Sequence, residues 1–98
     1  MERGDEAVAA RFREWDRQIA ALQRRCLQAP PGEGERLRAV LAEVAAARER
    51  AWSRWEQARA GGMWLNPDDV RRFQEGMGEA EEAFARAAAA VSAPARAA

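Results

Sequence analysis

The feature that most constrains this chain is a pair of apolar ladders whose members recur at alternating steps of three and four residues. At 3.6 residues per turn, that spacing places every member of a ladder on one narrow stripe of an α-helix. Two such helices bury their stripes by packing together at a shallow crossing angle. The first ladder is Val8, Phe12, Trp15, Ile19, Leu22 and Cys26, and the second is Val70, Phe73, Met77, Ala80, Phe84, Ala87 and Val91.

The middle of the chain carries a broader apolar face, which suits a helix that contacts two neighbours rather than one. Turn-forming residues separate it from the ladders, with Pro30 and Pro31 on one side and a Gly- and Pro-containing stretch over residues 61–67 on the other. We therefore predict helices over residues 5–28, 35–60 and 67–91, followed by a frayed tail over residues 92–98. The face of the middle helix consists of Leu37, Val40, Leu41, Val44, Ala47, Ala51, Trp52 and Trp55.

These segments predict an all-α fold. No segment alternates β-branched with polar residues as a strand would, and 98 residues suffice for one small domain only. We predict a single helical domain over residues 1–98, either an antiparallel three-helix bundle or a helical-hairpin or coiled-coil assembly. In an up-down-up bundle, one end would gather Phe12, Trp15, Trp52, Trp55, Trp64 and Phe73, and the other would hold Leu22, Cys26, Leu27, Leu37, Leu41, Phe84 and Val91.

The junction before residue 67 has the clearest local signals. Asn66 is a favourable N-cap, and Pro67 falls at the first helical position, where a missing N–H costs nothing. Leu65 and Val70 have the spacing of a hydrophobic staple. Gly61 follows the middle helix where a left-handed residue commonly ends a helix. The sequence therefore predicts that one helix stops and another starts within these few residues.

The composition excludes several kinds of chemistry. The chain has no His and one Cys, so it lacks an imidazole base, a disulfide and the usual zinc ligand sets. We therefore expect no enzymatic activity, no cofactor, no metal and no small-molecule substrate, and we interpret Cys26 as a core thiol in a reducing compartment. No stretch is apolar enough for a signal peptide or a membrane span, which predicts a cytoplasmic protein without membrane contact.

The charges balance to a net charge of zero, and acidic residues alternate with arginines along the first two predicted helices. No basic stripe forms, which disfavours nucleic acid as a partner. The carboxylates are best explained as a solvated surface, with Glu82 placed to pair with Arg86 four residues later. A quarter of the residues are alanines, which bury little area, so a partner or a second copy is expected to complete the core. Gly76 and Gly78 lie within the third predicted helix and indicate either a close helix approach or a kink where a partner packs.

The resulting hypothesis is a non-catalytic protein–protein interaction module, such as a small helical adaptor, chaperone or structural subunit of a bacterial assembly like a secretion system. Its partner would be another protein or itself, with a homo-oligomer favoured. The predicted interaction residues are Met63 and Trp64 at the turn, Met77 between its glycines and Val91 at the Ala-rich end. The alternative is a nucleic-acid-associated helical regulator that acts as a dimer. Its binding surface would be formed by Arg11, Arg24, Arg25, Arg36, Arg38 and Arg48.

Overall fold

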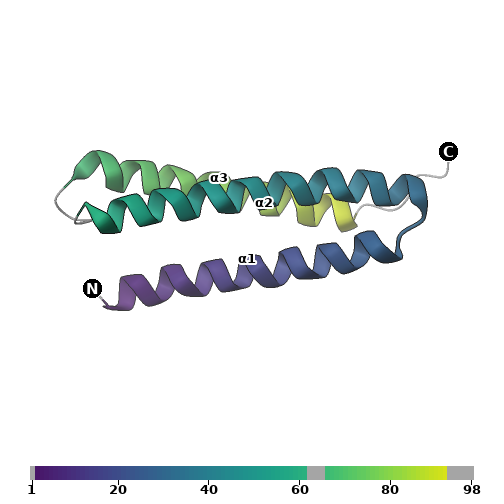
Figure 1. Ribbon diagram of the computed structural model, residues 1–98, viewed down its shortest axis with the longest axis horizontal. Helices are drawn as coiled ribbons and strands as arrows, with labels where there is room; N and C mark the ends of the chain where they lie inside the picture. Colours follow the sequence, from purple (N-terminus) through teal and green to yellow (C-terminus); the bar gives the residue numbers. More distant parts are fainter. Residues whose placement is uncertain (1, 62–65, 93–98) are drawn as a thin grey trace.

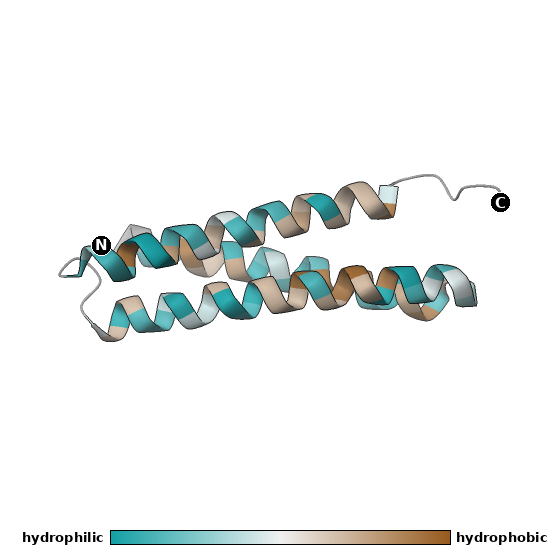
Figure 2. Cartoon of the chain, turned by 90° about the horizontal axis from the view of Figure 1, so that it is seen from above, coloured by the Kyte–Doolittle hydropathy of each residue, from teal (hydrophilic) through white to brown (hydrophobic). Residues whose placement is uncertain are grey.

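The computed structural model describes residues 2–61 and 66–92, with side chains from Asp5 onward, and it confirms an all-α bundle of three helices (Figure 1). Helix α1 spans Glu2–Gln28, α2 spans Pro31–Ala60 and α3 spans Pro67–Ser92. They run up, down and up, so α1 and α3 point in the same direction along a molecule of 54 × 21 × 16 Å. In the view from above, α2 and α3 lie side by side with α1 beyond them (Figure 2).

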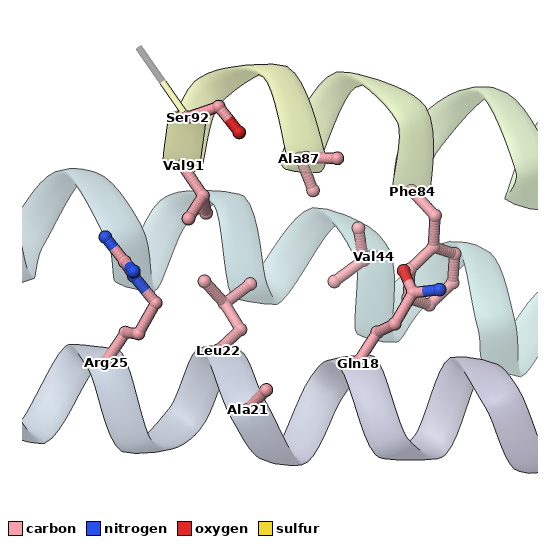
Figure 3. Close-up of a pocket in the computed structure, with 10 residues that line it drawn as sticks. Gln18, Ala21, Leu22, Arg25, Val44, Phe84, Ala87, Val91 and Ser92 are labelled. Atoms are coloured by element: carbon pink, nitrogen blue, oxygen red, sulfur yellow. The ribbon is translucent and has the colours of Figure 1, made fainter. Parts of the chain in front are cut away.

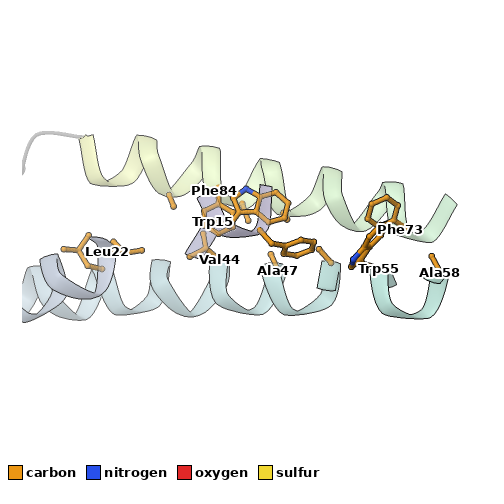
Figure 4. Packing of buried hydrophobic residues seen from close by; sticks show 14 residues of the cluster. Trp15, Leu22, Val44, Ala47, Trp55, Ala58, Phe73 and Phe84 are labelled. Atoms are coloured by element: carbon orange, nitrogen blue, oxygen red, sulfur yellow. The ribbon is translucent and has the colours of Figure 1, made fainter. Parts of the chain in front are cut away.

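The apolar ladders are buried as predicted (Figure 4). In α1, Phe12, Trp15 and Leu22 are buried, and the remaining members of the ladder are half-buried against them. Leu27 was expected in the core but is 88% exposed. It lies five residues after Leu22, a step that does not return to the same stripe of a 3.6-residue helix. The buried members of the second ladder are Phe73, Ala80, Phe84 and Ala87.

Helix α2 occupies the central position. It packs closely against both α1 and α3, whereas the backbones of α1 and α3 stay further apart (Figure 1). This confirms that the broad apolar face of the middle helix serves two neighbours. The buried residues on that face are Gly34, Leu37, Val44, Ala47, Ala51, Trp55 and Ala58.

The first junction differs from the prediction, because α2 begins at Pro31 instead of residue 35. Pro31 occupies the first helical position, where its fixed φ suits the helix and no N–H is required. The first turn is closed by the N–H of Gly34, which donates to the carbonyl of Pro30 over 2.7 Å. A Cβ on Gly34 would lie 3.6 Å from the carbonyl oxygen of Cys26, within van der Waals contact, so α2 starts close beside the end of α1.

The second junction confirms the predicted start of α3 at Pro67. The side-chain oxygen of Asn66 accepts hydrogen bonds from the backbone N–H groups of Asp68 at 3.0 Å and Asp69 at 3.4 Å. The predicted left-handed conformation of Gly61 is wrong, since its φ is −82°. Its N–H still donates to the carbonyl of Gln57, so the helical turn continues through it and needs no positive φ. Leu65, the other member of the predicted staple, lies outside the described residues.

The position of Phe84 along the bundle axis also differs from the prediction, which placed it at the same end of the bundle as Leu22 and Val91. Phe84 stacks on Trp15 near the middle of α1, with ring centroids 5.4 Å apart and planes 4° from parallel (Figure 4). The reason is the length of α2, whose 30 residues bring a position two thirds along α3 level with the middle of α1. Two of the aromatic residues predicted to gather at one end of the bundle, Phe12 and Trp52, are in contact, with ring centroids 5.0 Å apart. Trp64 and the predicted tail beyond Ser92 fall outside the described ranges.

Candidate functional site

The candidate site is the surface between α1 and α3. The backbones of these two helices are separated, and side chains bridge the gap between them. Trp15 stacks on Phe84 across this gap, and Arg11 forms an ion pair with Glu81 one turn away. On either side of these bridges the surface is hollowed into an apolar groove. We call the two grooves and the bridges between them the α1–α3 face.

The C-terminal groove has a volume of about 260 Å³ and is lined mainly by apolar side chains (Figure 3). Leu22 from α1 and Val91 from α3 approach one another across it, and Val44 of α2 forms its floor. At its edge lies Arg25, an exposed cation. Figure 3 shows this groove between the two helices, and its remaining lining residues are Gln18, Ala21, Phe84, Ala87, Ala88 and Ser92.

The N-terminal groove has the larger volume, about 400 Å³, and its mainly apolar lining includes polar side chains. Phe73 and Met77 contribute apolar surface from α3, and Val8 contributes it from α1. Gly78 lines the groove without a side chain, and a Cβ added there would meet no atom within 4 Å. The other lining residues are Ala7, Arg11, Gln74 and Glu81.

Two of the four predicted interaction residues lie on this face. Met77 lines the N-terminal groove and Val91 lines the C-terminal groove, so the structure places them at opposite ends of one surface. Met63 and Trp64 lie outside the described residues. Sequence reasoning missed the α1 side of the face, including Ala21. The sequence feature that could have indicated this face was the run of alanines in α3, because small side chains leave space between two neighbouring helices.

The seam between α1 and α2, by contrast, is closed by charge and aromatic contacts. Arg48 of α2 makes a two-point ion pair with Asp16 of α1, with N–O distances of 3.0 and 3.2 Å. Its guanidinium also lies 5.1 Å from the Phe12 ring centre and 5.4 Å from that of Trp52. With a side chain 21% exposed, Arg48 is partly shielded from water, which strengthens both kinds of contact.

The seam between α2 and α3 is closed even more tightly. A Cβ on Gly76 would lie 3.0 Å from Cδ of Arg54 and 3.4 Å from Cα of Ala51, so the two backbones approach closely here. This confirms the close-approach interpretation of Gly76. Arg54 also donates to the Glu79 carboxylate over 3.0 Å. Trp55 packs on Phe73 in the same seam, with ring centroids 5.0 Å apart.

Many of the surface carboxylates are paired with arginines. The predicted pair of Glu82 with Arg86 does not form, because Arg86 reaches across to Glu43 of α2 at 2.9 Å. In Glu33, the hydrogen bond from Arg36 lowers the carboxyl pKa below its ordinary value of 4.5, although partial burial opposes the shift. The same bond raises the pKa of Arg36.

Three of the six arginines of the nucleic-acid alternative are engaged in similar pairs. Arg11 pairs with Glu81, Arg36 with Glu33 and Arg48 with Asp16. An arginine already neutralised by a carboxylate contributes little to binding a phosphate backbone. Arg11, Arg36 and Arg48 therefore do not form an uninterrupted basic surface.

Metal-ligand clusters and buried polar residues are both missing from the described residues. No group of three or more acidic or Cys residues there could hold a metal ion, and none of the buried side chains there is polar or charged. Within the same ranges, no helix has the length and apolar character to cross a membrane. Comparisons with protein-family models, with curated proteins and with solved structures each find no match to this chain.

Proposed function

We propose that this chain is a non-catalytic protein–protein interaction module, a small helical adaptor, chaperone or structural subunit that docks another protein surface on its α1–α3 face. The observation that carries the proposal is the pair of apolar grooves between α1 and α3. Apolar surface rimmed by polar residues is typical of protein interaction sites. The rim here is formed by side chains such as Gln18, Arg25 and Gln74.

The shape of the face suits a helix as the docking element. Helices pack at short distances where small residues line the contact, and the groove linings include Ala21, Ala88 and Gly78. Larger side chains of a partner would then fill the space beside Leu22 and Val91, as an amphipathic helix does in a hydrophobic groove. A helix laid on this face would complete a four-helix arrangement.

The test compares two substitutions of exposed alanines on different faces of the bundle. Ala88→Arg places a long cation in the C-terminal groove, whereas Ala46→Arg places the same side chain on an exposed position of α2. Both positions are exposed in helices, so both variants should keep their helix content and stability. We expect Ala88→Arg to lose the protein complexes that the tagged wild-type chain forms in its host, and Ala46→Arg to retain them.

The readout is the light-scattering mass of the affinity-purified species, with far-UV circular dichroism as the folding control. Equal loss in both variants, or retention in both, would contradict the assignment of docking to the α1–α3 face. Trp64→Ala provides a second comparison, because the turn residues Met63 and Trp64 were the other predicted contacts. If docking extends to that turn, Trp64→Ala should weaken complex formation and leave helix content unchanged.

A further inference from the structure

The lining of the C-terminal groove carries one kind of charge. Among the described residues that line it, Arg25 alone is charged, and the others are apolar or, as with Gln18 and Ser92, polar and neutral. In the N-terminal groove the charged lining residues are Arg11 and Glu81, which form an ion pair with each other. The charge of the described groove linings that is left without compensation from the same lining is therefore the positive charge of Arg25.

The carboxylates of the chain itself do not neutralise Arg25. Within residues 5–61 and 66–92, Arg25 forms no ion pair with a carboxylate. Glu33 lines a hollow at the α1–α2 junction together with Arg25, but its carboxylate accepts a hydrogen bond from Arg36 over 3.1 Å. That hydrogen bond lowers the pKa of Glu33, and Arg25 adds to the effect only through its charge. The guanidinium of Arg25 is thus free to meet a carboxylate from another molecule.

We propose that the helix docked in the C-terminal groove carries an aspartate or glutamate against Arg25, one turn from an apolar side chain that fills the space beside Leu22. This inference rests on the proposed function and states the chemistry of its partner. Arg25 follows Leu22 by three residues, so both lie on one side of α1 about one turn apart. A partner helix with an apolar and an acidic residue three or four positions apart meets both side chains at once.

Docking makes the charge of the partner matter, because it removes water from the groove side of Arg25. A cation that loses water and faces an apolar or basic side chain is left uncompensated, and this opposes binding. A carboxylate in the same place restores the lost interaction and suppresses partners of the wrong charge. The groove therefore selects among apolar helices by the sign of one residue.

The direction of the partner helix follows from the directions of α1 and α3. Both helices run toward the Arg25 end of the groove (Figure 1), so their carbonyl ends lie at that end. A helix that runs the opposite way brings its positively polarised N–H end beside them, and an acidic residue in its first turn is stabilised by its own dipole as well as by Arg25. The four helices then alternate in direction, as in an up-down-up-down bundle.

The carbonyl ends of α1 and α3 act against an anion at this place, but other groups offset them. Each helix end is equivalent to about half an elementary charge, whereas Arg25 carries a full one. Helix α2 begins at the same end of the bundle, so its positive end offsets one of the two. At the end of α3, Arg36 donates a hydrogen bond to the carbonyl of Ala90 over 3.1 Å. The balance at the groove therefore favours an acidic residue.

The test uses helices of defined chemistry as the probe. A yeast-displayed library of single amphipathic helices carries Glu, Gln or Lys at varied positions in the first and last turns. The library is selected on the tagged wild-type chain, and only helices that no longer bind Ala88→Arg are kept, because that variant fills the groove. We expect Glu in the first turn to be enriched about tenfold over Lys in the helices that remain.

The same selection on three variants assigns the preference to Arg25. Arg25→Glu should reverse the preference to Lys, and Arg25→Gln should abolish it. Arg24→Glu is the matched control, since it makes the same change in net charge at an exposed neighbour outside the groove lining and should keep the preference for Glu. Far-UV circular dichroism establishes that each variant is folded, and both arginines are exposed.

Several results would overturn the proposal. These are equal enrichment of Glu and Lys, an unchanged preference on Arg25→Glu, an equal reversal on Arg24→Glu, and enrichment of Glu in the last turn instead of the first. The failure of this proposal is distinguishable from failure of the proposed function. Helices that bind the open groove without a charge preference contradict the acidic partner while the α1–α3 face remains a docking surface, whereas a library without any helix sensitive to Ala88→Arg contradicts both.

Discussion

The seams that α2 forms with α1 and α3 differ from the α1–α3 face in how side chains fill the space between the helices. In the seams, large rings and fully buried alanines fill the space between helices, and Gly76 removes even a methyl group where α2 and α3 meet. On the α1–α3 face, the Trp15–Phe84 stack and the Arg11–Glu81 ion pair span the gap, and the space on both sides is open. The difference indicates that the seams hold the fold, whereas the open face leaves apolar surface exposed, and this is the surface of the proposed docking site.

Under the proposed function, stability and docking depend on different surfaces of this small bundle. Burying a large apolar side chain contributes about 1.5–3 kcal/mol, and α2 alone supplies the buried Leu37, Val44 and Trp55. The half-buried residues of the face, such as Met77 and Val91, leave part of their apolar surface exposed. Substitutions should therefore divide into those that unfold the chain and those that only prevent docking.

The largest effect is expected from Trp55→Ala in the α2–α3 seam. The indole is buried against Phe73, so its removal loses the packing of a large ring and leaves a cavity. We expect the free energy of unfolding to fall by about 3–5 kcal/mol. Chemical denaturation followed by far-UV circular dichroism measures it in dilute protein. A loss below about 1 kcal/mol, comparable to a surface substitution, would remove the distinction between seam and face.

Two glycines of α3 offer a sharper comparison, since they differ chiefly in what lies beside them. Gly78→Ala adds a methyl group on the open face, where nothing lies within 4 Å, and should raise stability by about 1 kcal/mol through helix propensity. Gly76→Ala adds the same group against Arg54 and Ala51, and the tight contact should lower stability by about 1 kcal/mol. Equal gains in the two variants, by thermal unfolding in dilute protein, would show that the α2–α3 seam is not tightly packed.

A smaller effect is expected from the charge contact that closes the α1–α2 seam. Arg48→Ala removes a two-point ion pair with Asp16 and the cation–π contacts with two rings, so we expect a loss of about 1–2 kcal/mol. The matched control is Arg50→Ala two residues later, an exposed arginine that should change stability by less than about 0.5 kcal/mol. Indistinguishable unfolding midpoints would contradict the role assigned to Arg48.

The smallest effect is expected on acidification. The hydrogen bonds from Arg17 and Gln18 lower the pKa of Glu14, and that from Arg36 lowers the pKa of Glu33. A carboxyl whose pKa is lower in the folded chain contributes stability above its ordinary value of 4.5, and this contribution is lost as pH falls through the folded pKa. The melting temperature should fall slightly less steeply below pH 4.5 in Glu33→Gln than in wild type. Identical slopes would show that the pair does not contribute.

The sequence predicted the helices and most of the core because the period of apolar residues reports directly on which stripe is buried. The sequence also predicted where α3 begins, because the N-cap residue Asn66 is followed directly by a proline. The same reasoning placed Leu27 in the core and gave Gly61 a left-handed backbone, and both were wrong. A single apolar residue beside a ladder and a single glycine after a helix carry weaker information than a repeated pattern.

What the sequence could not predict is how the helices are placed relative to one another. The level of Phe84 beside Trp15 depends on the length of α2, and the start of α2 was displaced by several residues in the prediction. The choice of Glu43 over Glu82 as the partner of Arg86 depends on helix orientation. The grooves arise from the separation of α1 and α3, so only Met77 and Val91 of their lining were identified as interaction residues beforehand.

The most direct test of docking on the α1–α3 face is the rate at which single cysteines are alkylated in the cells that make the protein. In a Cys26→Ala background, Ala88→Cys reports on the C-terminal groove and Ala46→Cys on the outer surface of α2. Relative to dilute purified protein, we expect alkylation in cells to slow several-fold more at position 88 than at position 46. The same change in rate at both positions would contradict docking on this face.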